Sequence, residues 1–293
     1  MKKVSICVPT YGKPEYVRQL LDSTSRQTFT DYEVIITDDT DGSEVQEVAL
    51  SYQDTRIRYY KNPQKLGHIF NWNRAIELAE GEYIKIMFSD DWFTYDTSLE
   101  EYVALLEQHP EAGFAFSLSM QVSDHESYAR VIPDDFIVKL KQDYRYLFTG
   151  NFAGAPSGII YRNNGIKFDE KSNWASDLEL YLHLLSENPV FAFSERPLVS
   201  IGLHGEQYTY LFKKRDMRIF NDYYFMFEKY HLIQNEDCKR YFEEMMLEYG
   251  KGMLFAKKAG YKGLEYCKKM KQYLWKHKVL DYYEEVIRRI KRS

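Results

Sequence analysis

Two pairs of adjacent aspartates carry the clearest chemical signal in the sequence. Asp38-Asp39 follows the apolar run 33–37, and Asp90-Asp91 follows the apolar run 83–88. Adjacent carboxylates repel each other unless a positive charge lies between them. A divalent cation that carries phosphate oxygens meets this need, because Mg²⁺ and Mn²⁺ prefer oxygen ligands. For Asp90-Asp91 taken alone, an exposed acidic turn is the competing interpretation.

The elements that must position these pairs alternate between strands and helices. Short runs rich in β-branched and aromatic residues predict strands at 4–8, 33–37, 57–60 and 83–88, with helices between them. This order is typical of an α/β fold, a largely parallel sheet with helices on both faces. Ligands of such sheets bind at the carboxyl ends of the strands. We therefore expect both aspartate pairs to meet at one crevice.

The rest of the chain continues this pattern and then changes character. We expect further strands at 113–122, 157–162, 190–193 and 198–201, and helices at 98–108 and 174–186. Residues 123–150 read as a variable loop with a helical patch near 135–148. From about residue 208 onward the sequence predicts helices alone.

Composition excludes several classes of protein. The 293 residues are 44% hydrophobic and 28% charged, which is ordinary for a globular protein. No run approaches the roughly 20 apolar residues of a membrane span, and we expect no signal peptide. Three cysteines without metal spacing indicate a reducing compartment. The net charge of −5 argues against a nucleic-acid-binding protein. We expect a cytoplasmic location.

Charge is distributed unevenly along the chain. Residues 1–207 carry a net charge of −13, and residues 208–293 carry +8. Basic aromatic helices can lie on anionic membranes, which would make the protein peripheral at the inner face of the membrane. The sequence instead favours a helical cap or a homodimer contact through 208–293. Five glutamates dilute the positive charge there: Glu243, Glu244, Glu248, Glu284 and Glu285.

The opening segment 4–11 resembles the start of a family 2 glycosyltransferase. Further landmarks of that family follow in order: Gln27-Thr28-Phe29, Asp38-Asp39, Asn62, Gly67, Asn73, Ala79, Gly81-Glu82-Tyr83-Ile84 and Asp90-Asp91. The resemblance runs to about residue 115, with weaker landmarks to about 207. It implies the GT-A fold, a Rossmann-like, mostly parallel central sheet with flanking helices. It also implies an inverting, metal-dependent enzyme that uses nucleotide-diphospho sugars.

The same resemblance suggests how the chain is divided. The catalytic domain would span 1–207, with a nucleotide-binding part at about 1–115 and an acceptor-binding part at about 116–207. Residues 208–293 would form a C-terminal helical extension.

The resemblance also assigns a nucleotide-sugar site: Pro9, Thr10, Tyr11, Asp39, Gly67, Asn73 and Asp90. Tyr11 would stack on the base, a type of contact worth about 1–3 kcal/mol in nucleic-acid complexes. Asp39 would accept the imide N–H of uracil or thymine, and Asp38 would brace the loop. The alternatives are a packing aromatic for Tyr11 and a helix-surface amide for Asn73.

Metal binding is carried over onto Asp91 and His204. Asp91 would bind Mn²⁺ or Mg²⁺, while Asp90 would approach the ribose. The cation would neutralise the charge that develops on the diphosphate leaving group. His204 resembles a late histidine of the family, a pyrophosphate contact or metal ligand. The arginine that precedes it in the family is replaced here by Gly202.

Asp177 is the predicted catalytic base. An inverting transfer needs a group to take the proton from the attacking hydroxyl. The family uses a Glu-Asp pair at the start of a helix, and here Ser176 replaces the glutamate. The helix dipole would favour the anion of Asp177 and lower its basicity. A simple N-terminal helix carboxylate is the alternative.

The sequence therefore predicts a glycosyltransferase acting on a UDP-linked sugar. The acceptor would be a saccharide or lipid-linked saccharide, in the synthesis of a cell-surface polysaccharide. One rival is a non-catalytic sugar- or partner-binding protein on the same fold, which Ser176 and Gly202 keep open. The other is a nucleotidyltransferase, which needs a glycine-rich basic loop where this chain has only residues 12–15.

Overall fold

The computed structural model describes residues 2–205, 207, 212, 213 and 215–290, with only the backbone for 278–290. The chain divides into two compact units, Met1–Lys213 and Lys214–Ser293. The sequence analysis placed the division after residue 207. Of the aromatic and basic run that begins the predicted extension, residues 208–211 and 214 lie outside the described residues.

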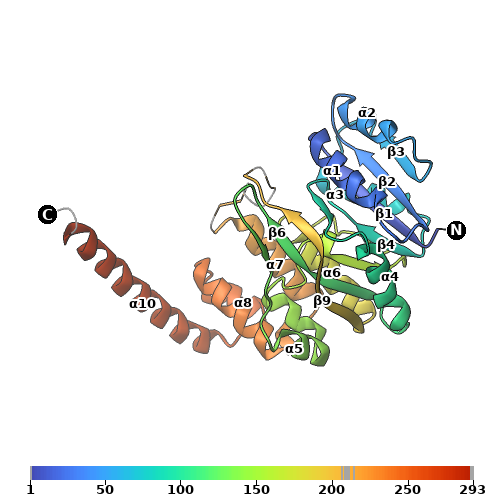
Figure 1. The fold of residues 1–293 in the computed structure, drawn as a ribbon. Coiled ribbons are helices and arrows are strands. Elements are labelled where there is room, and N and C mark those ends of the chain that lie inside the picture. Colours follow the sequence, from blue (N-terminus) through green and yellow to red (C-terminus); the bar gives the residue numbers. More distant parts are fainter. Residues whose placement is uncertain (1, 206, 208–211, 214, 291–293) are drawn as a thin grey trace. The chain divides into compact units, whose positions relative to one another are not determined.

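A single mixed sheet forms the centre of the N-terminal unit (Figure 1). Its nine strands in the described chain are β1 (Val4–Thr10), β2 (Tyr32–Asp38), β3 (Ile57–Lys61), β4 (Tyr83–Ile86), β5 (Asp91–Phe93), β6 (Phe114–Val122), β7 (Ser127–Ala129), β8 (Ile159–Arg162) and β9 (Phe191–Gly202). The order is β3-β2-β1-β4-β8-β6-β9-β5, and β7 pairs with β6. Strands β3, β2, β1 and β4 are parallel, as the sequence predicts.

The second half of the sheet departs from a simple parallel order. Strand β8 runs antiparallel to both β4 and β6, whereas β9 runs parallel to β6. Strand β4 ends at Ile86, earlier than the run 83–88 predicts. Asp91 begins the short strand β5 and lies opposite Ile201 of β9. The backbone at Asp91 is therefore held by strand pairing and is not a free turn.

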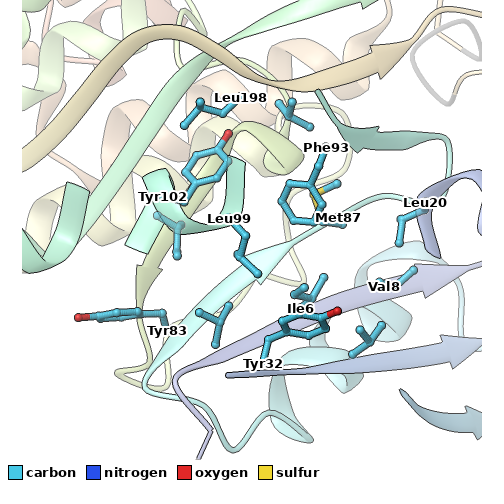
Figure 2. Close-up of a cluster of buried hydrophobic side chains, with 14 of the residues drawn as sticks. Ile6, Val8, Leu20, Tyr32, Tyr83, Met87, Phe93, Leu99, Tyr102 and Leu198 are labelled. Carbon is cyan, nitrogen blue, oxygen red and sulfur yellow. The ribbon is translucent and has the colours of Figure 1, made fainter. Parts of the chain in front are cut away.

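Six α-helices in the described part of this unit flank the sheet: α1 (Pro14–Ser25), α2 (Glu44–Ser51), α3 (His68–Glu77), α4 (Ser98–Gln108), α5 (Phe136–Gln142) and α6 (Ser176–Glu187). Helices α1, α2 and α4 pack on one sheet face, where Ile6 and Val8 meet Leu20 and Leu99 (Figure 2). All four side chains are fully buried, and each contributes roughly 1.5–3 kcal/mol on burial. Alternate residues of β1 point to the other face, where the Cys7 thiol donates to a carbonyl of α3.

The C-terminal unit is helical, with α7 (Met217–Lys229), α8 (Glu236–Glu248), α9 (Met253–Lys258) and α10 (Gly263–Ile290). Stacked aromatic rings hold α7 to α8, with Phe227 and Phe242 only 4.2 Å apart between centroids. Among the described helices, none has the length and apolarity needed to cross a bilayer.

Candidate active site

A cavity of about 980 Å³ opens at the carboxyl ends of the parallel strands. Its volume lies at the upper end of the range of small-molecule sites. Nine of the ten predicted site residues line it: Pro9, Thr10, Tyr11, Asp39, Gly67, Asp90, Asp91, Asp177 and His204. The structure thus brings together residues that are up to 195 positions apart in the sequence, from Pro9 to His204.

Asp39 organises one wall of the cavity. Its nearly buried carboxylate accepts hydrogen bonds from Asn62 Nδ2 at 2.5 Å and from the amide of Gly67 at 2.8 Å. The amide of Leu66 donates to both of its oxygens. Gly67 has φ +84°, a conformation that strains any residue with a side chain. Asp39 therefore shapes the loop before α3, in addition to facing the cavity.

Asp38 is fully buried and supports the same wall of the cavity from the side away from the cavity. Its carboxylate accepts from Thr40 N at 2.8 Å, Tyr59 OH at 2.7 Å and Lys61 Nζ at 3.3 Å. Burial acts to raise the pKa of this carboxyl. The hydrogen bonds and the Lys61 charge outweigh that effect and hold the pKa below its usual value. Asp38 is a structural anion, consistent with the predicted bracing role.

Tyr11 is 57% exposed at the cavity and is not a packing aromatic. The Lys65 ammonium lies 3.8 Å from the centroid of its ring, a cation–π contact. Lys65 also lines the cavity, and the sequence analysis did not identify it. A base that stacks on Tyr11 must use the opposite face of the ring or displace Lys65.

The structure does not place Asn73 in the cavity. Its side chain is buried and makes two 2.9 Å hydrogen bonds to the backbone of Phe168, so it is not a helix-surface amide either. Asn71 lines the cavity instead and donates to the carbonyl of Thr10. Residues two apart in a helix point in different directions, which is why the two asparagines have different roles.

Asp90 and His204 form a pair at the cavity. The distance from Asp90 Oδ2 to His204 Nε2 is 3.0 Å, and the two side chains are about one quarter exposed. The imidazole also lies against Tyr16, with 5.2 Å between ring centroids. The sequence did not predict Tyr16 of α1 at the site.

Asp91 is only 3% exposed, although it lines the cavity. Its Oδ1 accepts a hydrogen bond from the amide of Gly202 at 3.2 Å. Burial and the neighbouring Asp90 charge raise the pKa of Asp91 well above its ordinary value. Behind it, the fully buried Lys85 donates to the carbonyl of Ser157. Burial lowers the pKa of Lys85 to about 7, and the charge of Asp91 acts in the opposite direction.

Close packing against Asp90 explains why position 202 is a glycine. A Cβ atom at this position would lie 2.4 Å from the carbonyl oxygen of Asp90. Strand β9 and the turn at Asp90 therefore approach more closely than any residue other than glycine permits. The arginine of the family pattern does not fit here without moving Asp90.

Asp177 is the second residue of α6 and faces the cavity. Its carboxylate accepts from Asn151 Nδ2 at 2.6 Å and from the amide of Leu178 at 2.7 Å. Burial raises the pKa of Asp177 to about 6, against the smaller opposing effect of the backbone hydrogen bonds at the helix start. The expected lowering of basicity by the helix dipole is therefore wrong, because burial is the larger effect. A pKa near 6 suits a general base at neutral pH.

Aromatic side chains supply most of the apolar lining. Trp72 and Phe88 lie 4.7 Å apart between centroids, and Trp174 precedes the helix that carries Asp177. Such rings can cover the apolar faces of a sugar or a base. The sequence did not predict Trp72 at the site.

The described residues contain no group of three or more His, Cys, Asp or Glu side chains arranged to hold a metal ion. The side chains that could contribute are Asp91 and His204, with Asp90 holding the imidazole. A carboxylate and an imidazole suit Mn²⁺ better than Mg²⁺, since Mg²⁺ prefers oxygen donors alone. The remaining coordination positions would fall to diphosphate oxygens and water, a common arrangement at nucleotide sites. The donor set therefore fits a cation that binds together with its nucleotide.

Comparison with known proteins agrees with this geometry. The model of glycosyl transferase family 2 matches residues 5–167. An uncharacterized glycosyltransferase of Methanocaldococcus jannaschii is 24% identical over 227 residues, 75% of this chain and 77% of that protein. A putative colanic acid biosynthesis glycosyl transferase of Escherichia coli K12 is 27% identical over 187 residues, 63% of this chain and 66% of that protein. The crystal structure of S. aureus TarS with UDP-GlcNAc has a TM-score of 0.64 at 19% identity, covering 84% and 72% of the two chains.

Proposed function

The chain belongs to glycosyltransferase family 2 and has the GT-A fold, and we propose that it transfers a sugar, with inversion, from a UDP-linked donor to a saccharide or lipid-linked saccharide. The observation that carries this proposal is the 980 Å³ cavity. In it, an acidic pair and a carboxylate suited to base catalysis face one space. The colanic acid relative supports a role in making a cell-surface polysaccharide.

We place the nucleotide at the wall formed by Tyr11, Asp39 and Asn71. This wall is rigid, because buried hydrogen bonds fix the Asp39 carboxylate and the adjoining loop. TarS, which shares the fold, binds UDP-GlcNAc, and this supports UDP over other nucleotides. The uracil imide N–H would donate to the Asp39 carboxylate, which already accepts hydrogen bonds from the protein. The carboxylate would therefore accept this further hydrogen bond at its edge.

The diphosphate would lie beside Asp90, Asp91 and His204. We propose that Asp91 and His204 hold a divalent cation, while Asp90 fixes the imidazole and approaches the ribose. When bound, the cation would neutralise charge on the departing diphosphate. Without it, the two carboxylates would repel the diphosphate.

Asp177 would take the proton from the acceptor hydroxyl as that oxygen attacks the anomeric carbon. The C–O bond to the acceptor forms on one face while the bond to the diphosphate oxygen breaks on the other, which gives inversion. Asn151 holds the Asp177 carboxylate in place for this step. The raised pKa makes Asp177 a stronger base than an ordinary aspartate and leaves it ionised at pH 7.

Calorimetry with UDP tests the donor site, and hydrolysis of UDP-sugars tests catalysis. We expect UDP to bind tightly only with Mn²⁺ present, and we expect slow Mn²⁺-dependent release of UDP from at least one UDP-sugar. Absence of UDP binding under both conditions would reject the donor assignment. Tight binding with no hydrolysis or transfer for any donor would favour the non-catalytic sugar-binding alternative.

A further inference from the structure

The positive charge of the C-terminal unit is concentrated in one stretch. Residues 251–277 contain eight lysines and one acidic residue, Glu265, whereas residues 215–250 contain five basic and eight acidic residues. Among the glutamates expected to dilute the positive charge, Glu243, Glu244 and Glu248 lie on α8, outside this stretch. The stretch covers α9 and the first half of α10.

Large apolar side chains of the same stretch are exposed. Leu254 is 80% exposed, Leu264 78%, Trp275 71% and Leu274 50%. A helix has 3.6 residues per turn, so Leu264 and Trp275, eleven residues apart, lie on the same side of α10. The exposed Lys268 and Lys271 lie between them on that side. We call these residues, with Leu274 on the adjoining flank, the Leu–Trp–Lys surface.

The buried side of α10 fixes which way this surface points. Tyr266 is fully buried, and its hydroxyl donates to the carbonyl of Lys251 at 2.7 Å. Lys269 pairs with Glu243 of α8 and so lies on the inner flank of the helix. The start of α10 is thus held to its own unit by one side, while the Leu–Trp–Lys surface occupies the opposite side.

We propose that the Leu–Trp–Lys surface docks on an anionic lipid bilayer. Leu and Trp side chains enter the boundary between headgroups and acyl chains, and lysines contact the lipid phosphates. The lysine stems can lie along the apolar layer while their ammonium groups reach the headgroups. A bilayer surface satisfies both kinds of side chain at once.

A second copy of the chain is a poorer occupant for this surface. The cores of protein–protein interfaces are depleted in lysine, and the charged residues lie at the rim. Here Lys268 and Lys271 lie between Leu264 and Trp275, so a protein interface would bury the lysines together with the apolar side chains. An acidic partner would pair with the lysines and leave three large apolar side chains unmatched.

Vesicle co-sedimentation of the full chain tests the proposal. The probes are vesicles of phosphatidylcholine alone and of phosphatidylcholine mixed with phosphatidylglycerol in a roughly two-to-one ratio. We expect binding to the anionic vesicles only, weakening as salt is added. The double variant Lys268→Gln/Lys271→Gln should bind about 25-fold more weakly, about fivefold for each lysine. The double variant Leu264→Gln/Trp275→Gln should lose at least about tenfold.

Matched controls lie on the N-terminal unit. Val131 and Val138 are 83% and 57% exposed, so Val131→Gln/Val138→Gln also replaces two exposed apolar side chains by glutamine. Lys141→Gln/Lys171→Gln removes the same charge from two other exposed positions. Both controls should bind anionic vesicles as the unchanged protein does, and thermal melts of all four variants check folding.

Three outcomes would overturn the proposal. Equal binding to neutral and anionic vesicles would reject the role of the lysines. Test and control variants that bind alike would reject the assigned surface. A dimer in light scattering that becomes a monomer in the Leu264→Gln/Trp275→Gln variant would make a second copy the occupant. Lipid binding is measured without donor or acceptor, so its failure would leave the proposed transferase activity untouched.

Discussion

Two pairs of adjacent aspartates lie at the carboxyl ends of β2 and β4, the two parallel strands on either side of β1, and their environments differ. Asp38 and Asp39 accept hydrogen bonds from a tyrosine, a lysine, an asparagine and backbone amides. The pKa of Asp38 is lowered as a result. Asp91 accepts from the Ser157 hydroxyl and from the Gly202 amide at 3.2 Å, but burial and the neighbouring Asp90 charge outweigh these donors and raise its pKa. The ionised Asp38 therefore stabilises the fold, whereas ionisation of Asp91 opposes folding.

This difference in hydrogen bonding distinguishes carboxylates that hold the cavity wall from carboxylates that can take part in the reaction. A carboxylate saturated by protein donors cannot change partners without breaking the loop that it holds. A carboxylate with few donors beside a second one gains most from a ligand that brings positive charge. Asp177 belongs with the second kind, because burial also raises its pKa. Function and stability should therefore respond oppositely to substitution at the two kinds of site.

The largest effect is expected for Asp177→Asn. Turnover should fall by about 10²–10⁴-fold, the usual contribution of a general base. Affinity for UDP, measured by calorimetry, should stay unchanged because the proposed nucleotide contacts do not include Asp177. The control is Glu187→Gln at the far end of the same helix, which should keep full activity. Loss of UDP affinity together with turnover would instead assign Asp177 to the donor site.

The Asp177→Asn variant should also have a melting temperature at pH 7 equal to or higher than that of the unchanged protein. A carboxyl with a raised pKa binds its proton more tightly when folded, so its ionisation opposes folding as pH rises from about 4 to about 6. The asparagine removes that opposition while it keeps the shape of the side chain. A clearly lower melting temperature would place Asp177 among the structural carboxylates.

Asp91→Asn should lower Mn²⁺-dependent turnover by about a thousandfold, since the cation contributes several kcal/mol to stabilising the leaving group. The stimulation of UDP binding by Mn²⁺ should disappear, and calorimetry with and without the metal measures it. The melting temperature should not fall, because the substitution removes a poorly solvated charge. Retained Mn²⁺ stimulation would remove Asp91 from the proposed metal site and break the contrast with Asp38.

The opposite behaviour is expected for Asp38→Asn, a destabilisation of about 1–3 kcal/mol. The carboxylate accepts from Thr10 and Thr40 on one oxygen and from Tyr59 and Lys61 on the other, so an asparagine N–H₂ group would replace one of these acceptors and face its donors. In the unchanged protein, a lowered pKa supplies stability that is present above about pH 4 and lost as pH falls through the folded-state pKa. Urea unfolding from pH 7 to pH 3 measures both effects. A variant as stable as the unchanged protein across this range would contradict the assignment.

Much of the fold was predictable because the signals are local. The strand at 57–60 and the helix at 98–108 were predicted nearly residue for residue from composition and periodicity. Strand β5 has only three residues and exists through its pairing with β9. Strand β9 was predicted as two strands, 190–193 and 198–201, yet its pairing with β6 continues across an irregularity. A local sequence pattern does not show which strands pair with residues far away in the chain.

The site was predictable in residue type and less so in environment. The ordered landmarks located nine of ten predicted lining residues, since each is tied to a strand end or a helix start. They did not distinguish Asn71 from Asn73, because both are polar positions in one helix and only tertiary packing against Phe168 separates them. They also gave the wrong direction for the basicity of Asp177, because burial depends on elements far away in the sequence.

The smallest expected effect is a shift in the pH dependence of turnover. It is the most sensitive test of the contrast between the two kinds of carboxylate. Turnover at saturating metal should fall on the acid side with an apparent pKa near 6, because Asp177 must be ionised to act as a base. The hydrogen bond from Asn151 favours the anion, so Asn151→Leu should move this acid limb to higher pH, by up to about one unit. The measurement is a pH–rate profile of kcat/KM. The matched control is Asn163→Leu, an exposed asparagine that bonds only backbone carbonyls, which should leave the limb in place. If the acid limb does not shift in Asn151→Leu while activity falls at every pH, Asn151 only supports packing. Hydrogen-bond donors would then lower the pKa of Asp38 but not that of the catalytic carboxylate.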